Sequence, residues 1–298
     1  MSSRKPHIRP AREAGFSYTR TAHRGGKPRQ CGLTEIRGPY YSVVGRNYLE
    51  DVLATMGDYI DSFKFAGGSF TLLPTNELRG IIALCHDHGL QVSTGGFIEH
   101  VLTLGENCVD RYLTDCKKLG FDVIELSAGF ISIPFEDWLR LVQKVRKLGL
   151  KAKPEVGIQF GSGGATPAGD LELEGVQDVE SAILKIKRFL DAGAEIVMIE
   201  SEGITESVRT WRTEVPAKII QAVGLEPVMF EAADPAVFGW YVKNYGPEVN
   251  LFVDHSQIVQ LECLRSGIWG TKDLWGRIVT YKGDEGEKQG QVPFSSAS

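Results

Sequence analysis

The chain has 298 residues, of which 42% are hydrophobic and 24% charged, and its net charge is −5. This is enough apolar material for a large core, and no stretch approaches the roughly 18 to 20 apolar residues of a membrane span. Residues 1–30 hold eight Lys or Arg against one acid, so the remainder is acidic, with 25 basic and 37 acidic side chains. An acidic body argues against nucleic-acid binding, which depends on neutralising phosphates. We therefore expect neither a nucleic acid nor a membrane as partner.

The first thirty residues lack apolar periodicity and are rich in Arg. Such a composition fits either a disordered basic leader or a weak organellar transit peptide, and it lacks the apolar stretch of a secretory signal. The five cysteines show no CxxC spacing, so they predict neither a disulfide framework nor a zinc site. A reducing, cytoplasmic setting fits this pattern.

From Cys31 onward, short apolar runs alternate with amphipathic segments. This alternation predicts eight strand–helix units, a single-domain (β/α)₈ TIM barrel of the α/β class over residues 31–282, followed by a disordered polar tail over 283–298. The first strand lacks the GxGxxG motif of a dinucleotide fold. The expected strands are 32–37, 59–65, 90–94, 123–127, 151–156, 196–200, 228–232 and 250–254. The expected helices are 48–56, 76–88, 106–119, 134–148, 178–192, 212–223, 234–245 and 258–266.

The longest predicted loop, residues 157–177, follows the fifth strand and contains several glycines. A loop of this length in a compact barrel is usually functional, so we expect a mobile lid that closes over the mouth. Its backbone amides around residues 161–164 would then face a bound anion.

Several apolar strands end on an acid, as in the run Ile-Val-Met-Ile-Glu at residues 196–200. The carboxyl ends of barrel strands meet at one face, where active sites lie. Burying several unpaired carboxylates is costly, so their convergence indicates a site. The alternative is that these acids form structural ion pairs with neighbouring lysines. The acids in question are Glu125, Glu155, Glu200, Glu231 and Asp254.

Basic residues accompany these acids. Lys64 lies inside an apolar strand and is predicted to face an anion, although its ammonium group could also extend to the rim. Lys153 and Glu155 share one strand face, so they form either a bland ion pair or a catalytic pair. Arg265, with the glycines that follow the last strand, is typical of a barrel phosphate site or of a plain surface turn. Arg37 and His255 end their strands and are candidates to bind substrate.

Across the predicted strands and the segments that join them, the sequence resembles the phosphosulfolactate synthase family. Its members are barrel enzymes that add sulfite to phosphoenolpyruvate in a magnesium-dependent reaction. The resemblance covers nearly the whole barrel. Residues 253–257 and the basic leader are most similar to the eukaryotic, plant heat-stress-associated branch. The segments that carry the resemblance are 57–61, 63–65, 95–96, 119–121, 124–127, 155–157, 191–194, 199–200, 230–232 and 261–265.

The resemblance implies a lyase that joins a small anionic nucleophile to a phosphorylated acid such as phosphoenolpyruvate. Lys64 and Lys153 would neutralise substrate charge, and Glu125 or Glu155 would transfer a proton. Magnesium, which prefers carboxylate oxygens, would be held by Glu200 and Glu231. Arg37, His255 and Arg265 would bind the substrate. We also expect a homo-oligomer.

Three positions depart from the family pattern. Ala128, Ile158 and Ser201 occupy segments that carry charged residues in archaeal members, including a lysine and an arginine that an anion site would use. The alternative is therefore a barrel that has lost catalysis and acts as a heat-stress-associated interaction protein, bound to a chaperone or a client. A third possibility is Schiff-base chemistry, which needs a lysine of lowered pKa at position 64 or 153.

Overall fold

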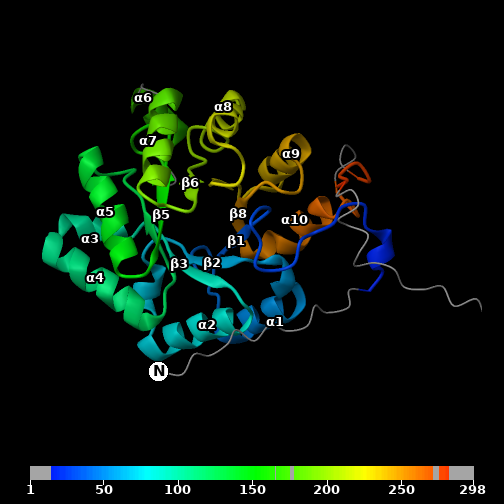
Figure 1. Ribbon diagram of the computed structural model, residues 1–298, viewed down its shortest axis with the longest axis horizontal. Coiled ribbons are helices and arrows are strands. Elements are labelled where there is room, and N and C mark those ends of the chain that lie inside the picture. The colour runs from blue at the N-terminus through cyan, green and yellow to red at the C-terminus, as the bar shows by residue number, and fades with distance from the viewer. Residues whose placement is uncertain (1–14, 165, 175–177, 271–274, 282–298) are drawn as a thin grey trace, which may run out of the picture.

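The structure is a computed structural model, and it describes residues 15–164, 166–174, 178–270 and 275–281. Eight parallel strands close into a barrel in sequence order, β1 to β8, which confirms the predicted (β/α)₈ TIM barrel (Figure 1). Each observed strand lies within its predicted range. The strands are β1 (Thr34–Arg37), β2 (Ser62–Phe65), β3 (Gln91–Thr94), β4 (Val123–Leu126), β5 (Lys151–Val156), β6 (Val197–Ile199), β7 (Val228–Glu231) and β8 (Leu251–Asp254).

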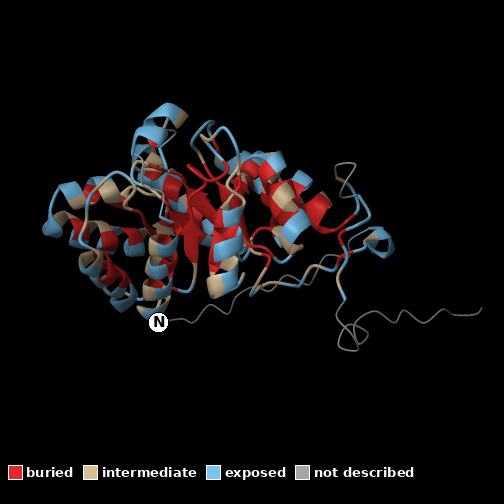
Figure 2. Ribbon diagram, turned by 90° about the horizontal axis from the view of Figure 1, so that it is seen from above, coloured by how far each residue is buried: buried red, intermediate tan, exposed pale blue. Residues whose placement is uncertain are grey.

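The helices surround the barrel, with their exposed faces turned outward (Figure 2). Two of them, α3 and α6, were not predicted: both are short, and α6 lies in the segment predicted as a loop. No helix in the described ranges is long and apolar enough to cross a membrane. The α-helices are α1 (Arg46–Met56), α2 (Thr75–Asp87), α3 (Ile98–Thr103), α4 (Glu106–Leu119), α5 (Phe135–Lys147), α6 (Ala168–Glu174), α7 (Val179–Asp191), α8 (Glu214–Val223), α9 (Pro235–Tyr245) and α10 (Ile258–Arg265), with 3₁₀ turns at Ser17–Thr19, Gly57–Tyr59, Ser69–Leu72 and His255–Gln257.

The alternation of side chains along each strand separates two environments. One set packs between strands and helices in the main core, as Ile36, Phe63 and Ile124 do. The other set points into the barrel. On β6, β7 and β8 this inner set is a small apolar cluster around Met198, Met229 and Phe252, with Glu231 above it at the end of β7. On β1, β2, β4 and β5 the inner set is charged, so one half of the barrel interior is polar.

The N-terminal segment packs against the end of the barrel where the strands begin. Arg24 pairs with Glu262 of α10 at 3.2 Å, and Arg29 pairs with Asp61, just before β2, at 2.8 Å. The hydroxyl of Thr21 donates to the carbonyl of Ile278, so both ends of the described chain meet there (Figure 1). The prediction of a disordered leader over 1–30 is therefore wrong for residues 21–30. Residues 1–14 and the predicted tail 283–298 lie outside the described part.

Candidate active site

A chain of ion pairs crosses the polar half of the barrel. Lys153 lies 2.5 Å from Glu35 and 3.3 Å from Glu125. Lys64 then lies 2.7 Å from Glu125 and 3.5 Å from Glu155. All five side chains are nearly enclosed, so each charge is compensated by a neighbour on another strand, as buried charges require. Charges therefore alternate from Glu35, low in the barrel, to Glu155 near its mouth.

A cavity of about 380 Å³ opens above this chain, at the carboxyl ends of the strands. Phe252 lies beneath two of its cations, with the Lys64 Nζ 4.4 Å and the Arg37 guanidinium carbon 5.0 Å from the ring centroid. Arg37 also pairs with Glu231 and faces the ring of Tyr41. These contacts fix two positive charges at one wall of the cavity.

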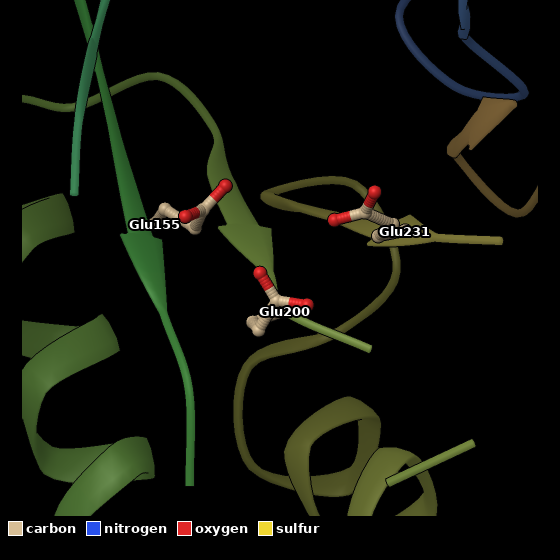
Figure 3. A group of neighbouring side chains, drawn as sticks. All are labelled: Glu155, Glu200 and Glu231. Atoms are coloured by element: carbon tan, nitrogen blue, oxygen red, sulfur yellow. The ribbon is translucent and has the colours of Figure 1, made fainter. Parts of the chain in front are cut away.

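Three carboxylates meet beside these cations, with Glu231 against Arg37 and Glu155 against Lys64. Glu155 ends β5, Glu200 follows β6 and Glu231 ends β7, and each offers an oxygen within 4.8 Å of the other two. Their carboxyl groups point into one shared space (Figure 3). Burial, together with repulsion from Glu125, raises the pKa of Glu155 to about 8. Burial and the charge of Glu231 raise the pKa of Glu200 well above its ordinary value, and burial raises that of Glu231.

The charged residues that cross the barrel interior and meet at the cavity, five carboxylates and three cations, do not balance one another. When every member is ionised, five carboxylates face three cations, which leaves two negative charges uncompensated. Three further acids line the cavity and accept hydrogen bonds elsewhere: Glu99 and Glu202 accept from backbone amides, and Glu206 accepts from Ser201. One divalent cation would balance the two uncompensated charges of the group, and carboxylate oxygens are the ligands that hard cations prefer. The residues present therefore fit a magnesium-type ion. The group consists of Glu35, Glu125, Glu155, Glu200 and Glu231 against Arg37, Lys64 and Lys153.

The raised pKa values predict proton release when a cation binds. A cation needs ionised carboxylates, whereas Glu155, with a pKa of about 8, is largely protonated below that pH. The apparent affinity for magnesium should rise from pH 6 to pH 8. Titration calorimetry at pH 6.5 in buffers of different ionisation enthalpy should count at least one proton released per ion. A pH-independent affinity would contradict the assignment.

The same shift has a consequence for stability without the cation. An acid whose pKa is higher in the folded than in the unfolded state holds its proton more tightly when folded. Its stabilising contribution is present at low pH and is lost as the pH rises through the folded pKa. We therefore infer that Glu155 contributes stability below pH 5, which disappears as the pH passes 8.

The long loop after β5 is held by hydrogen bonds to Glu202, which follows β6. The amides of Gly163 and Thr166 donate to the Glu202 carboxylate at 2.7 and 3.0 Å. Gly129 also lies against this loop, since an added Cβ there would stand 2.3 Å from the carbonyl oxygen of Ser162. The prediction that these amides face a bound anion is therefore wrong for this structure, because a protein carboxylate already occupies them. The segment also contains α6, so it is not a plain loop.

Two predicted substrate-binding residues lie outside the cavity. Arg265 is fully buried at the opposite end of the barrel, where it donates to the carbonyls of Gly32 and Val249, both at 2.7 Å. It closes the bottom of the barrel, so the prediction of a phosphate site at Arg265 is wrong. The ring of His255 turns away, with Nδ1 3.0 Å from the carbonyl of Arg37 and the ring against Tyr48. It therefore supports β1 from behind and does not face the substrate space.

Neither lysine fits Schiff-base chemistry. Burial alone would lower the pKa of Lys64, but the attraction of Glu125 and Glu155 outweighs it and raises the pKa. A nucleophilic amine needs the opposite shift. Lys153 is 2% exposed and lies below the cavity, between Glu35 and Glu125, so the prediction that it meets the substrate is also wrong. Its predicted partner Glu155 pairs with Lys64 instead.

Sequence reasoning missed two members of the site. Glu35 lies in the middle of β1, not at a strand end, so the search for terminal acids passed over it. Its position two residues before Arg37 places both on the inner face, and that spacing could have revealed it. Phe252 looked like an ordinary core residue. Only the closed barrel brings its ring beneath Lys64.

Comparison with known proteins gives a consistent picture. The family model described as (2R)-phospho-3-sulfolactate synthase (ComA) matches residues 22–271. The protein HEAT-STRESS-ASSOCIATED 32 of Arabidopsis thaliana is 40% identical over 259 residues, which cover 84% of this chain and 91% of the relative. The phosphosulfolactate synthase of Methanocaldococcus jannaschii is 28% identical over 239 residues, 78% of this chain and 90% of that enzyme. The similarity therefore spans the barrel and its site.

Solved structures of distant sequence share the fold alone. The carboxyl transferase domain of Rhizobium etli pyruvate carboxylase, determined with pyruvate, superposes with a TM-score of 0.53 at 10% identity. The match covers 80% of this chain and 40% of that one. At this level of identity it supports the barrel architecture and nothing about the reaction.

Proposed function

Because the chain belongs to the (2R)-phospho-3-sulfolactate synthase family, we propose that it is a carbon–sulfur lyase that adds sulfite, or a similar small anion, to phosphoenolpyruvate with the help of magnesium. One observation supports the proposal. Glu155, Glu200 and Glu231 bring three carboxylate oxygens close enough together to hold one cation, directly beside the charges of Lys64 and Arg37. A cation held by these carboxylates, together with the two adjacent basic groups, would bind the carboxylate and the phosphate of a phosphorylated acid.

In this reaction the sulfur bonds to C3 of the enol acid, the C2–C3 double bond opens, and C2 gains a proton. A magnesium ion bound by the carboxylates would stabilise the negative charge that develops on the substrate carboxylate. Lys64 lines the cavity and stays protonated because Glu125 and Glu155 stabilise its charge, so it would be the group that delivers the proton to C2. Arg37 would hold the phosphate. Glu125 keeps the Lys64 ammonium aimed into the cavity.

The product is the direct test. Purified protein with phosphoenolpyruvate, magnesium and ³⁴S-labelled sulfite should form phosphosulfolactate, whose mass shifts by about two units from that made with ordinary sulfite. The variant Lys64→Met should form at least about 100-fold less, since it lacks the proton donor. Lys151→Met, which removes an exposed lysine from the same barrel, is the control and should retain activity. No labelled product at high enzyme concentration would refute the proposed reaction.

A second function is favoured because the cavity lacks basic residues that archaeal relatives are expected to carry. Ile158 is buried where archaeal relatives are expected to carry a lysine. The Glu202 carboxylate accepts hydrogen bonds from backbone amides and is therefore not free to bind a ligand. An interaction protein with a heat-stress role, as the name of the Arabidopsis relative suggests, needs no turnover. Cells that carry the double variant Lys64→Met and Glu200→Gln would then keep their heat tolerance. Under the lyase function they should lose it together with the product.

A further inference from the structure

A second, larger cavity adjoins the carboxylates and is not used by the reaction above. It measures about 710 Å³ and lies between the loops after β4 and β5 and the first turns of α5 and α7. Glu155 and Glu200 line both this cavity and the smaller one, so the two spaces meet at the proposed cation ligands. Sulfite and phosphoenolpyruvate fill little of this volume, which is in the range of pockets for drug-sized ligands.

The wall of this second cavity, which we call the annex, is mainly apolar. Trp138 is buried in its floor, whereas Phe160 is 48% exposed on the loop after β5, although a large aromatic ring favours burial. An exposed ring beside an apolar hollow is what a ligand would cover. The apolar residues used here are Ile131, Ile133, Phe135, Trp138, Ile158 and Phe160.

The charges exclude a small inorganic anion from the annex. Among the described residues that line it, Lys185 is the one basic side chain. Of the four acids in the lining, two belong to the proposed cation site, and Glu174 and Asp178 remain. A dianion would meet net repulsion there, while an uncharged apolar group would gain from burial. The buried Ile158 strengthens this preference, because it adds apolar surface next to the carboxylates.

We infer that the site accepts a small acid that carries an aromatic or branched aliphatic substituent. Its acid head binds at the cation held by Glu155 and Glu200, and its apolar group fills the annex between α5 and α7. The inference rests on the proposed function only in requiring that cation. It differs in the substrate class, since the family's named product has no apolar group.

Binding of two related acids tests this directly. With magnesium present, calorimetry should show that phenylpyruvate binds about 10- to 100-fold more tightly than pyruvate, the gain expected from burying a phenyl ring. Ser181→Trp, which fills the annex from α7, should reduce that advantage to less than about threefold and leave pyruvate binding unchanged. Leu184→Trp places the same ring on the exposed side of α7 and should keep the full advantage.

The two proposals fail in different ways. If pyruvate binds with magnesium and phenylpyruvate binds no more tightly, the annex is not a substituent site and this inference is overturned. If neither acid binds in a magnesium-dependent manner, the cation site itself fails, and with it the proposed function. Should Ser181→Trp unfold, the milder loop change Ile131→Ser must lower phenylpyruvate affinity about threefold or more, and an unchanged affinity would overturn the inference.

Discussion

Glu200→Gln should abolish activity and at the same time make the cation-free protein more stable at pH 8. The amide removes one of the three proposed cation ligands, so magnesium affinity should fall by at least about 100-fold, the upper range seen for residues that merely support a ligand. It also removes a carboxylate whose pKa is raised by burial and by Glu231. Relief of that repulsion should raise the melting temperature without magnesium.

A thermal shift measurement with and without magnesium reads out both effects. The wild type should gain stability with the ion, as any ligand of the folded state causes, and the variant should not. Asp254→Asn is a matched control. That acid also ends a strand at the same face, but it caps the following turn through Ser256. Equal stabilisation of wild type and Glu200→Gln by magnesium would contradict the assigned ligands.

Lys153→Met should lower the free energy of unfolding by about 3 to 5 kcal/mol, the usual cost of leaving buried charges without their partner. The substitution keeps the length of the side chain and leaves Glu35 without its ion-pair partner inside the barrel, while Glu125 keeps only Lys64. Urea denaturation of the purified variant measures the change. A catalytic lysine would give a different result, with activity lost and stability retained.

Lys151→Met provides the comparison. It lies two residues earlier on the same strand and face, but its pair with Glu195 is exposed, so its loss should cost less than about 1 kcal/mol. The double variant Lys153→Met and Glu35→Leu should recover part of the loss, because the uncompensated acid is gone. A single variant Lys153→Met as stable as the wild type would show that the ion-pair chain does not hold the barrel interior together.

Local pattern was sufficient to predict the barrel. Each strand is visible in the sequence as a short apolar run. The helix α4 ends at Gly120, which has a φ of 107°, where the sequence predicted its end. The acids that end β5 and β7, and Glu200 just after β6, were likewise readable, because the carboxyl ends of barrel strands meet by topology alone. The convergence of these three residues follows from the fold without any knowledge of side-chain contacts.

The local pattern did not show toward which end of the barrel a side chain points, or how deep in the barrel it lies. Arg265 follows the last strand along the sequence, yet α10 carries it back to the opposite end of the barrel. Arg24 and Arg29 looked like free basic charge, because their partners Glu262 and Asp61 lie far away in sequence. Lys153 lies one layer deeper than Lys64, a difference set by the stagger of the strands. Such facts depend on long-range pairing, which a single sequence does not display.

Crystals soaked in manganese test the central claim most directly. Manganese takes the same oxygen ligands as magnesium and scatters anomalously, so its position can be mapped without reference to activity. We predict one strong anomalous peak among the carboxylates of Glu155, Glu200 and Glu231, lost in Glu200→Gln. A peak elsewhere, or no peak at a concentration that shifts the melting temperature, would contradict the account.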